Sequence, residues 1–190
     1  KVKSDVLAQE ARFKVARTSY FKGDFVWAKA QTDVLRKSTS QLIANDALKM
    51  TLMIHDNTLE DSLQTALKKY ARADFLALQN KDAQAIEVLS EILTTHKGEK
   101  IEDEALLKQA ELFQKTGQYK KAEANYLKII AVYKDEILAD DAYFKLANLY
   151  EHQLQDPQKA KQYYEQIIFE FADSIYFTQA RKKYRMLRGR

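Results

Sequence analysis

Three histidines and two acidic runs are the residues of this chain that could do metal or acid–base chemistry. His55, His96 and His152 lie far apart in the sequence, and none has a second histidine or a carboxylate pair at metal-ligand spacing. We therefore expect all three to be exposed surface residues. The acidic runs 102–104 and 140–141 open expected helices, where the helix dipole favours negative charge, so capping explains them without general-acid chemistry.

The sequence lacks the residues that a cysteine nucleophile or a glycine-rich phosphate-binding loop needs. The 190 residues include no cysteine and only four glycines. A thiolate zinc site, a cysteine nucleophile, a Walker loop and a dinucleotide-binding loop are therefore missing from the sequence. We expect no enzyme activity, no cofactor, no metal and no small-molecule substrate.

Aromatic residues are plentiful, with eleven Tyr and nine Phe, and many return at a fixed spacing. The order small, aromatic, small, aromatic, aliphatic has a period of 37 residues, counted from Ala110 to Ala147. One copy is Ala110, Phe113, Ala122, Tyr126 and Ile129, and the next is Ala147, Tyr150, Ala160, Tyr164 and Ile167. A chain that repeats one helix pair forms a solenoid, because each pair leaves an apolar face that only its neighbour covers.

The composition favours helices throughout. Hydrophobic residues are 46% and charged residues 31%, with a single proline. We predict an all-α fold, an α-solenoid of about ten helices in a right-handed superhelix, with residues 1–190 as a single array. The expected helix pairs are at about 4–37, 59–95, 101–133 and 135–171, with an extra helix at 41–55 and a capping helix at 174–188.

The ends of the chain say little about its location. No apolar run reaches the roughly 18 residues of a transmembrane helix. The chain begins at Lys1 without a methionine, so we expect a trimmed N-terminus, and a missing signal peptide then carries no information.

At its repeated positions the chain resembles the tetratricopeptide repeat family. The pattern is met well by 106–133, recognisably by 143–171, more weakly by 70–94 and partially by 10–37. The family's Trp and its proline between repeats are missing. The resemblance implies a helical solenoid and a non-catalytic scaffold that binds a protein or peptide partner.

The closing segment 164–188 is similar to the last repeat of bacterial envelope proteins, the BamD- and CpoB-like family. The family's Phe/Tyr-Pro-x-Ser motif is present here with Ala172 in place of the proline. The segment 38–48 resembles large repeat proteins of Bacteroidetes. These resemblances imply one part of a larger envelope assembly, periplasmic or outer-membrane-associated rather than cytoplasmic.

The family holds extended peptides on the inner face of its first helices, where mixed aromatic and polar side chains suit a peptide groove. The matching positions here are Phe13, Arg17, Tyr20, Tyr70, Asp74, Ala77, Leu107, Glu111, Gln114, Phe144, Asn148 and Glu151. We expect Tyr20, Tyr70 and Phe144 to be partly exposed anchors. The subfamily that clamps a C-terminal carboxylate uses a lysine at the position of Phe13, Tyr70, Leu107 and Phe144, so that ligand is not expected.

The C-terminus is basic. No acid follows Asp173, whereas six cations do: Arg181, Lys182, Lys183, Arg185, Arg188 and Arg190. We expect the solvated face of a capping helix, and the alternative is binding to an anionic surface or nucleic acid through this helix. Nucleic acid is not the expected partner, because interleaved exposed aromatics are missing and the net charge is only +4.

Overall fold

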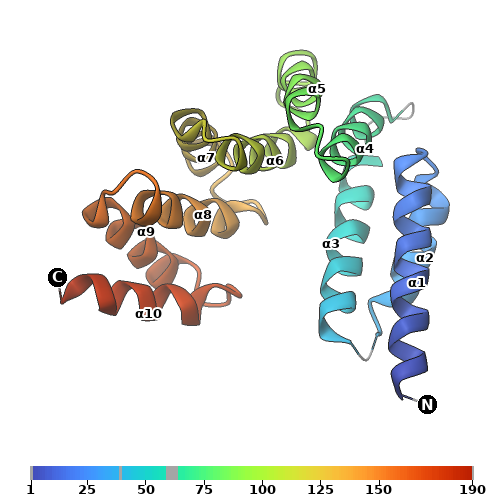
Figure 1. The fold of residues 1–190 in the computed structure, drawn as a ribbon, viewed down its shortest axis with the longest axis horizontal. Coiled ribbons are helices and arrows are strands. Elements are labelled where there is room, and N and C mark those ends of the chain that lie inside the picture. Colours follow the sequence, from blue (N-terminus) through green and yellow to red (C-terminus); the bar gives the residue numbers. More distant parts are fainter. Residues whose placement is uncertain (1, 39, 59–63, 190) are drawn as a thin grey trace. The chain divides into compact units, whose positions relative to one another are not determined.

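The structure, a computed structural model, describes residues 2–38, 40–58 and 64–189. These residues form ten α-helices and no strand (Figure 1). The helices are α1 (Val2–Phe21), α2 (Phe25–Leu35), α3 (Gln41–Thr58), α4 (Thr65–Leu78), α5 (Asp82–Thr95), α6 (Ile101–Lys115), α7 (Tyr119–Val132), α8 (Ala139–His152), α9 (Pro157–Glu170) and α10 (Phe177–Arg188). The predicted all-α class, built from helix pairs, is confirmed.

Three helix boundaries differ from the prediction by three residues or more. α3 continues to Thr58, three residues beyond the expected end, and α8 and α10 begin later than expected, at Ala139 and Phe177. Both late starts follow a loop of two tight turns, closed before α10 by the bonds from Ser174 N to Phe171 O (3.1 Å) and from Phe177 N to Ser174 O (3.0 Å). The expected start of the fourth helix, at 59, lies outside the described residues.

A residue in the left-handed backbone conformation follows each of the helices α1, α4 and α6. Gly23 and Gly117 take φ values of +80° and +76° after α1 and α6, an angle that glycine adopts without strain. Asn80 takes the same conformation after α4, with φ +57°. α9 starts as its sequence predicts, because Asp156 Oδ1 accepts a bond from Lys159 N (3.0 Å) and Pro157 opens the helix.

The helices fall into two compact units, Lys1–Ile101 and Glu102–Arg190. In the first unit α1 pairs with α2 and α4 pairs with α5, while α3 packs on α2. The extra helix is tied into the core, because Ile43 and Ala47 pack with Leu35. The single array and its superhelix remain predictions.

In the second unit α8 pairs with α9, α7 packs on α8, and α10 packs on α9. The repeated alanines Ala122, Ala147 and Ala160 are fully buried, as the close approach of two helices requires. Tyr126 and Tyr164 are fully buried in the grooves beside them. The core positions taken from the repeat pattern are therefore confirmed.

Candidate functional site

In the second unit, a band of polar side chains lies on α6, α8 and α10. We call Glu111, Gln114, Lys145, Asn148, Glu151 and Lys183 the polar band; they lie on α6, α8 and α10. Glu111 and Asn148 are 37 residues apart, as are Gln114 and Glu151. Each pair therefore occupies equivalent places on α6 and α8, and the same face is presented by successive helices.

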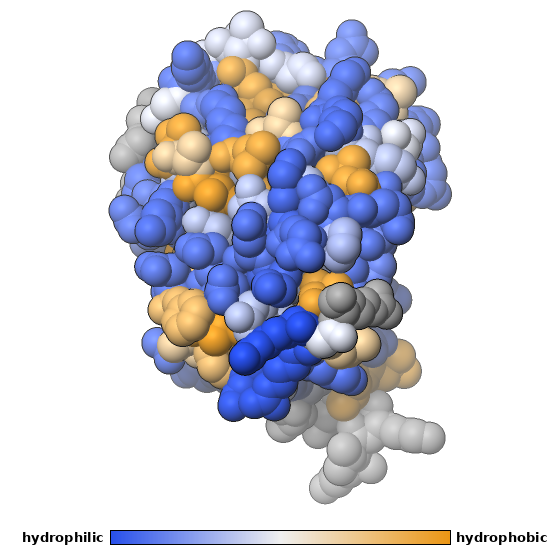
Figure 2. Space-filling view, turned by 90° about the vertical axis from the view of Figure 1, so that its left-hand side faces the viewer, coloured by the Kyte–Doolittle hydropathy of each residue, from blue (hydrophilic) through white to orange (hydrophobic). Residues whose placement is uncertain are grey.

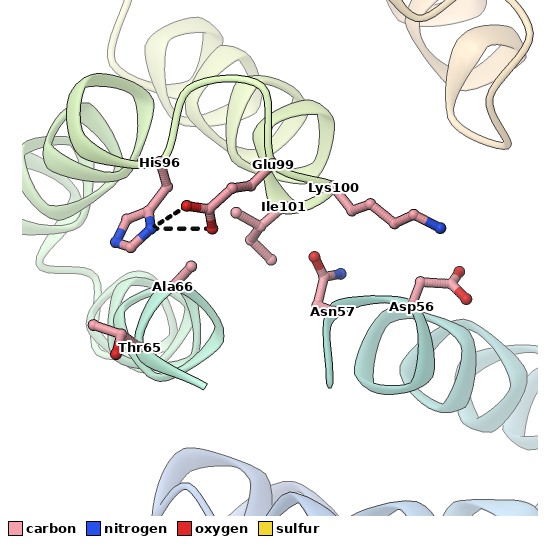
Figure 3. Close-up of a pocket in the computed structure, with 8 residues that line it drawn as sticks. All are labelled: Asp56, Asn57, Thr65, Ala66, His96, Glu99, Lys100 and Ile101. Atoms are coloured by element: carbon pink, nitrogen blue, oxygen red, sulfur yellow. Dashed lines mark hydrogen bonds and ion pairs between the residues drawn. The ribbon is translucent and has the colours of Figure 1, made fainter. Parts of the chain in front are cut away.

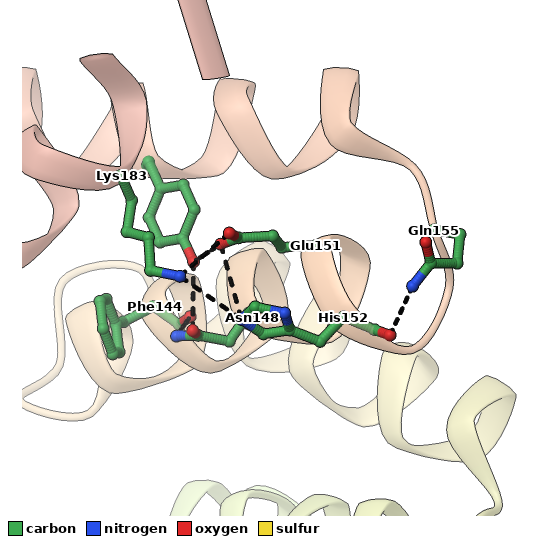
Figure 4. Close-up of polar contacts among 7 residues, drawn as sticks. Phe144, Asn148, Glu151, His152, Gln155 and Lys183 are labelled. Atoms are coloured by element: carbon green, nitrogen blue, oxygen red, sulfur yellow. Dashed lines mark hydrogen bonds and ion pairs between the residues drawn. The ribbon is translucent and has the colours of Figure 1, made fainter. Parts of the chain in front are cut away.

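Acid–lysine pairs connect each first helix to the next. Lys145 Nζ lies 2.8 Å from Glu111 Oε1 and joins α8 to α6. Lys183 Nζ lies 3.0 Å from Glu151 Oε1 and joins α10 to α8 (Figure 4). The two lysines hold equivalent positions of successive helices, whereas their partners are one turn apart, because Glu151 is equivalent to Gln114 rather than to Glu111.

Buried tyrosines on α7 and α9 donate hydrogen bonds to residues of the polar band. The Tyr126 hydroxyl donates to Gln114 Oε1 (3.2 Å). The Tyr164 hydroxyl donates to Asn148 Oδ1 (3.1 Å) and Glu151 Oε2 (2.8 Å). Asn148 Nδ2 also donates to the Phe144 carbonyl oxygen (2.8 Å), so its amide is fixed at both ends (Figure 4).

These contacts set the protonation states. Burial alone would raise the pKa of the Glu151 carboxyl, but hydrogen bonds from Lys183 and Tyr164 outweigh burial and keep this pKa below its ordinary value. Burial and the neighbouring Glu151 carboxylate raise the pKa of the Tyr164 hydroxyl. At neutral pH, Glu151 is therefore charged and Tyr164 is a hydrogen-bond donor.

The band is reachable from solvent. The Glu111 side chain is 38% exposed and the Glu151 side chain 16%, while Gln114 and Asn148 are half-buried. Carboxylates, ammonium groups and amides thus alternate along one partly open surface. Such a surface can bind the main chain and the charged side chains of an extended peptide.

The expected exposure of the aromatic anchors is wrong for two of the three. Tyr20 is fully buried beside Phe25, with ring centroids 5.7 Å apart. Phe144 is buried because Tyr176, which precedes α10, stacks on it at 4.3 Å. Tyr70 is half-buried.

The other expected residues of the first unit lie on α1 and α4. Phe13 packs against the core of Leu35, Ile43 and Ala47. The Arg17 guanidinium lies over the Phe21 ring at 5.5 Å from its centroid, and Asp74 is half-buried. Of the expected residues, Glu111, Gln114, Asn148 and Glu151 of α6 and α8 belong to the polar band.

The sequence interpretation missed the two lysines of the band. Lys145 and Lys183 were outside the positions taken from the family resemblance. Their signal is present in the sequence, because Lys145 and Lys183 follow the aligned stretches Asp135–Ala142 and Asp173–Ala180 at the same offset. The sequence did not show which acid each lysine pairs with, because Glu111 and Glu151 occupy different positions of the repeat.

One polar pocket lies in the first unit. It has a volume of about 490 Å³ and is lined by Asp56, Asn57, Thr65, Ala66, His96, Glu99, Lys100 and Ile101 (Figure 3). His96 Nδ1 lies 2.9 Å and 3.1 Å from the two carboxylate oxygens of Glu99. Asp56 and Lys100 point away from this pair in Figure 3, so we assign no reaction to it.

The expectation that all three histidines are exposed is wrong for His96. Its side chain is only 14% exposed, because it turns toward Glu99, whereas His55 and His152 are exposed. Within the described part of the chain, no group of histidine, aspartate and glutamate side chains could hold a metal ion.

The last helix presents a basic surface. Arg181, Lys182, Arg185 and Arg188 are exposed, while Ala180 and Leu187 are buried. The basic residues therefore face water and the apolar ones face α9. On the side of the molecule shown in Figure 2, hydrophilic residues predominate and apolar residues form separate smaller groups.

Comparison with known families identifies the repeats of the second unit. Residues 104–135 and 141–174 each match the tetratricopeptide repeat family. Repeats of this family generally mediate protein–protein interaction and are typically non-catalytic. No curated protein matches the chain. Among the described residues, no helix has the length and apolar character needed to cross a membrane.

Proposed function

We propose that this chain is a non-catalytic scaffold that binds a peptide or protein partner through the polar band. The observation that supports it most is the attachment of Gln114, Asn148 and Glu151 to buried tyrosine hydroxyls. Side chains fixed before binding lose less conformational entropy when a partner arrives. The family resemblance supports the proposal, because it assigns Glu111, Gln114, Asn148 and Glu151 to the positions with which the family holds peptides.

The chemistry of the band favours a partner with charges of both signs. Glu111 and Lys145 neutralise each other in the free protein (2.8 Å), so a bound peptide can insert its own charges between them. The Gln114 amide nitrogen is a further donor for a peptide carbonyl. Phe144 supports the polar band as a buried residue. In the first unit, Phe13, Arg17, Tyr20, Tyr70 and Asp74 stay proposed partner-binding residues of α1 and α4.

A peptide selection tests this proposal. A random peptide library is selected on the purified chain, and the affinity of an enriched peptide is measured by fluorescence anisotropy. Reversal of one charge, as in Glu111→Lys, should weaken binding about tenfold, which corresponds to about 1.4 kcal/mol. Lys97→Glu, in an exposed loop, is the matched control and should change nothing. If Glu111→Lys and Lys145→Glu both bind the peptide as tightly as the unmodified chain does, the polar band is not the binding site.

We further propose that the scaffold is one part of a bacterial envelope assembly. The support is the resemblance of 164–188 to the closing repeat of envelope proteins. Cell fractionation of the source organism with an antibody to the chain tests the location. Recovery in the periplasmic or outer-membrane fraction is expected, and recovery in the cytoplasmic fraction alone would overturn this part.

A second candidate function is attachment to an anionic surface through α10. Arg181, Lys182, Arg185 and Arg188 are exposed, and they have no acidic partner among the described residues. Binding of this type weakens steeply with salt, because each neutralised phosphate releases counterions. Titration of anionic vesicles and of single-stranded DNA at low and high salt tests this binding. Reversal of the charges of Arg181, Lys182, Arg185 and Arg188 should abolish it and should leave peptide binding at the polar band unchanged.

A further inference from the structure

Two loops of the second unit, one before α8 and one before α10, have the same backbone structure. In the loop before α8, Glu136 N donates to Tyr133 O (3.1 Å) and Ala139 N donates to Glu136 O (3.1 Å). The loop before α10 repeats both hydrogen bonds 38 residues later. α8 and α10 begin at the same end of this unit (Figure 1). The two loops therefore present residues of equivalent places in the same way.

Each loop carries an exposed isoleucine at the same place. Ile137 is 66% exposed and Ile175 is 74% exposed, and the two lie 38 residues apart. A single exposed apolar side chain is common on protein surfaces. An exposed isoleucine that returns at the same place of two similar loops is less common and indicates a surface that contacts a partner.

A groove lies between the two loops. Its volume is about 460 Å³, and Ile137 is one of its lining residues. The Ser174 hydroxyl donates to Asp140 Oδ2 (2.6 Å), and the Tyr176 hydroxyl donates to Asp141 Oδ1 (2.6 Å). Both bonds tie the loop before α10 to the first turn of α8. The walls of the groove are therefore fixed before a partner arrives, which lowers the entropy cost of binding.

The groove carries an excess of negative charge. Its described lining residues include one lysine, Lys134, and five acids: Asp135, Glu136, Asp140, Glu170 and Asp173. Lys134 Nζ lies 3.9 Å from Glu170 Oε2, and both side chains are exposed, so solvent screens this pair. Asp135, Glu136 and Asp173 are exposed and form no ion pair with the described residues. A partner with positive charge therefore complements the groove.

These acids are not arranged as a metal site. Within the described residues, no group of histidine, aspartate and glutamate side chains could hold a metal ion. Lysine and arginine side chains carry their charge at the end of an apolar stem. A side chain of this kind suits a groove in which carboxylates surround Ile137 and the half-buried Phe171.

We infer that this groove binds a basic segment of another protein, one in which a large apolar side chain lies between arginine or lysine residues. The apolar side chain packs against Ile137 and Ile175. The flanking cations pair with Asp135, Glu136 and Asp173. The groove shares no residue with the polar band, so this inference extends the proposed scaffold function without depending on that surface.

A second copy of this chain fits the groove less well. Its basic helix α10 carries Met186, which is 54% exposed. Successive helical residues are about 100° apart, so the exposed Lys182 and Arg185 lie on the same side of Met186. Lys183 lies on the other side and pairs with Glu151 (3.0 Å). α10 therefore does not offer cations on both sides of one apolar side chain.

Three synthetic peptides of about ten residues, about 33 Å long when extended, test the inference. The basic apolar peptide has a leucine between arginines. The acidic control has glutamates in place of the arginines, and the alanine control keeps the arginines and has alanine in place of the leucine. Fluorescence anisotropy measures the binding of each peptide to the full chain. The basic apolar peptide should bind at least about tenfold more tightly than either control.

Variants of the exposed residues locate the binding. Ile137→Ser combined with Ile175→Ser should weaken binding of the basic apolar peptide at least about tenfold. Asp135→Asn combined with Asp173→Asn should also weaken it, and more at low salt than at high salt. Val26→Ser, at an exposed valine of α2, is the matched control and should bind like the unmodified chain.

Three results would overturn the inference. The first is a control peptide that binds as tightly as the basic apolar peptide. The second is unchanged binding by the isoleucine double variant while circular dichroism shows it folded. The third is self-association in sedimentation that the isoleucine double variant abolishes, because a second copy would then be the occupant. Glu111→Lys should leave this binding intact, so failure of this inference and failure of the polar band can be told apart.

Discussion

Glu151 has the best-defined environment among the side chains of the polar band. Its carboxylate accepts from Lys183 of α10 (3.0 Å) and from the buried Tyr164 of α9 (2.8 Å). Three helices therefore meet at one carboxylate. A hydrogen-bonded charge that is mostly buried contributes more than an exposed pair, because solvent screens it less.

Glu151→Gln should lower the free energy of unfolding by about 1–2 kcal/mol at pH 7. Because the folded-state pKa of Glu151 is below the ordinary value of 4.5, its contribution is present above that pH and is lost as the pH falls through the folded pKa. The stability difference between the two proteins should therefore shrink below about pH 4.5. Urea unfolding at several pH values measures it.

Glu91→Gln is the control for this change. Glu91 pairs with Lys69 at 2.5 Å, but its side chain is exposed, so we expect an effect below about 0.5 kcal/mol. If both variants lower the free energy of unfolding by the same amount at pH 7, the contacts of Glu151 stabilise the protein no more than an exposed ion pair does.

Phe144→Ala should act on stability rather than on partner contact. The ring is buried between Tyr164 and Tyr176 (5.9 Å and 4.3 Å between centroids). Removing it leaves a cavity, and we expect a loss of about 3–5 kcal/mol. A variant that melts normally but loses its partner would show that Phe144 is an anchor after all.

At the scale of the helix, close packing depends on the repeated alanines. Ala147→Leu should destabilise the protein by about 1–3 kcal/mol, because α8 and α9 have no room for the added methylenes. Ala131→Leu on α7 is the control, because Ala131 is exposed. Thermal unfolding compares the two, and unchanged melting of both would contradict the helix register.

α10 should behave as a cap on α9. Deletion of 174–190 removes Ala180, Tyr184 and Leu187 from α9 and should expose apolar surface there. We expect binding of a hydrophobic dye and aggregation on mild heating. A truncated chain that stays monomeric with full helicity in its remaining helices would show that α10 is a tail.

Much of the element pattern was predictable, because it depends on local signals. Asp156 with Pro157 fixed the start of α9, and Gly117 fixed the end of α6. The burial of Phe144 was not predictable in the same way, because it depends on Tyr176, which lies 32 residues further along the chain. His96 was missed for a related reason, since its partner Glu99 folds back across a loop that carries no helical periodicity.

At the scale of the whole molecule, two surfaces have different chemistry. The polar band carries both charge signs, whereas Arg181, Lys182, Arg185 and Arg188 of α10 form a basic surface. A scaffold with separate surfaces can hold more than one partner at once. The polar band is central to the proposed function, because all of its residues except Lys183 lie in the matched repeats.

The most direct test of the central claim is an NMR titration of the isotope-labelled chain with the peptide selected on it. The account predicts chemical-shift changes concentrated at Glu111, Gln114, Lys145 and Asn148, and their disappearance in the Glu111→Lys variant. Changes confined to α10 or to α1, with the polar band unaffected, would contradict it.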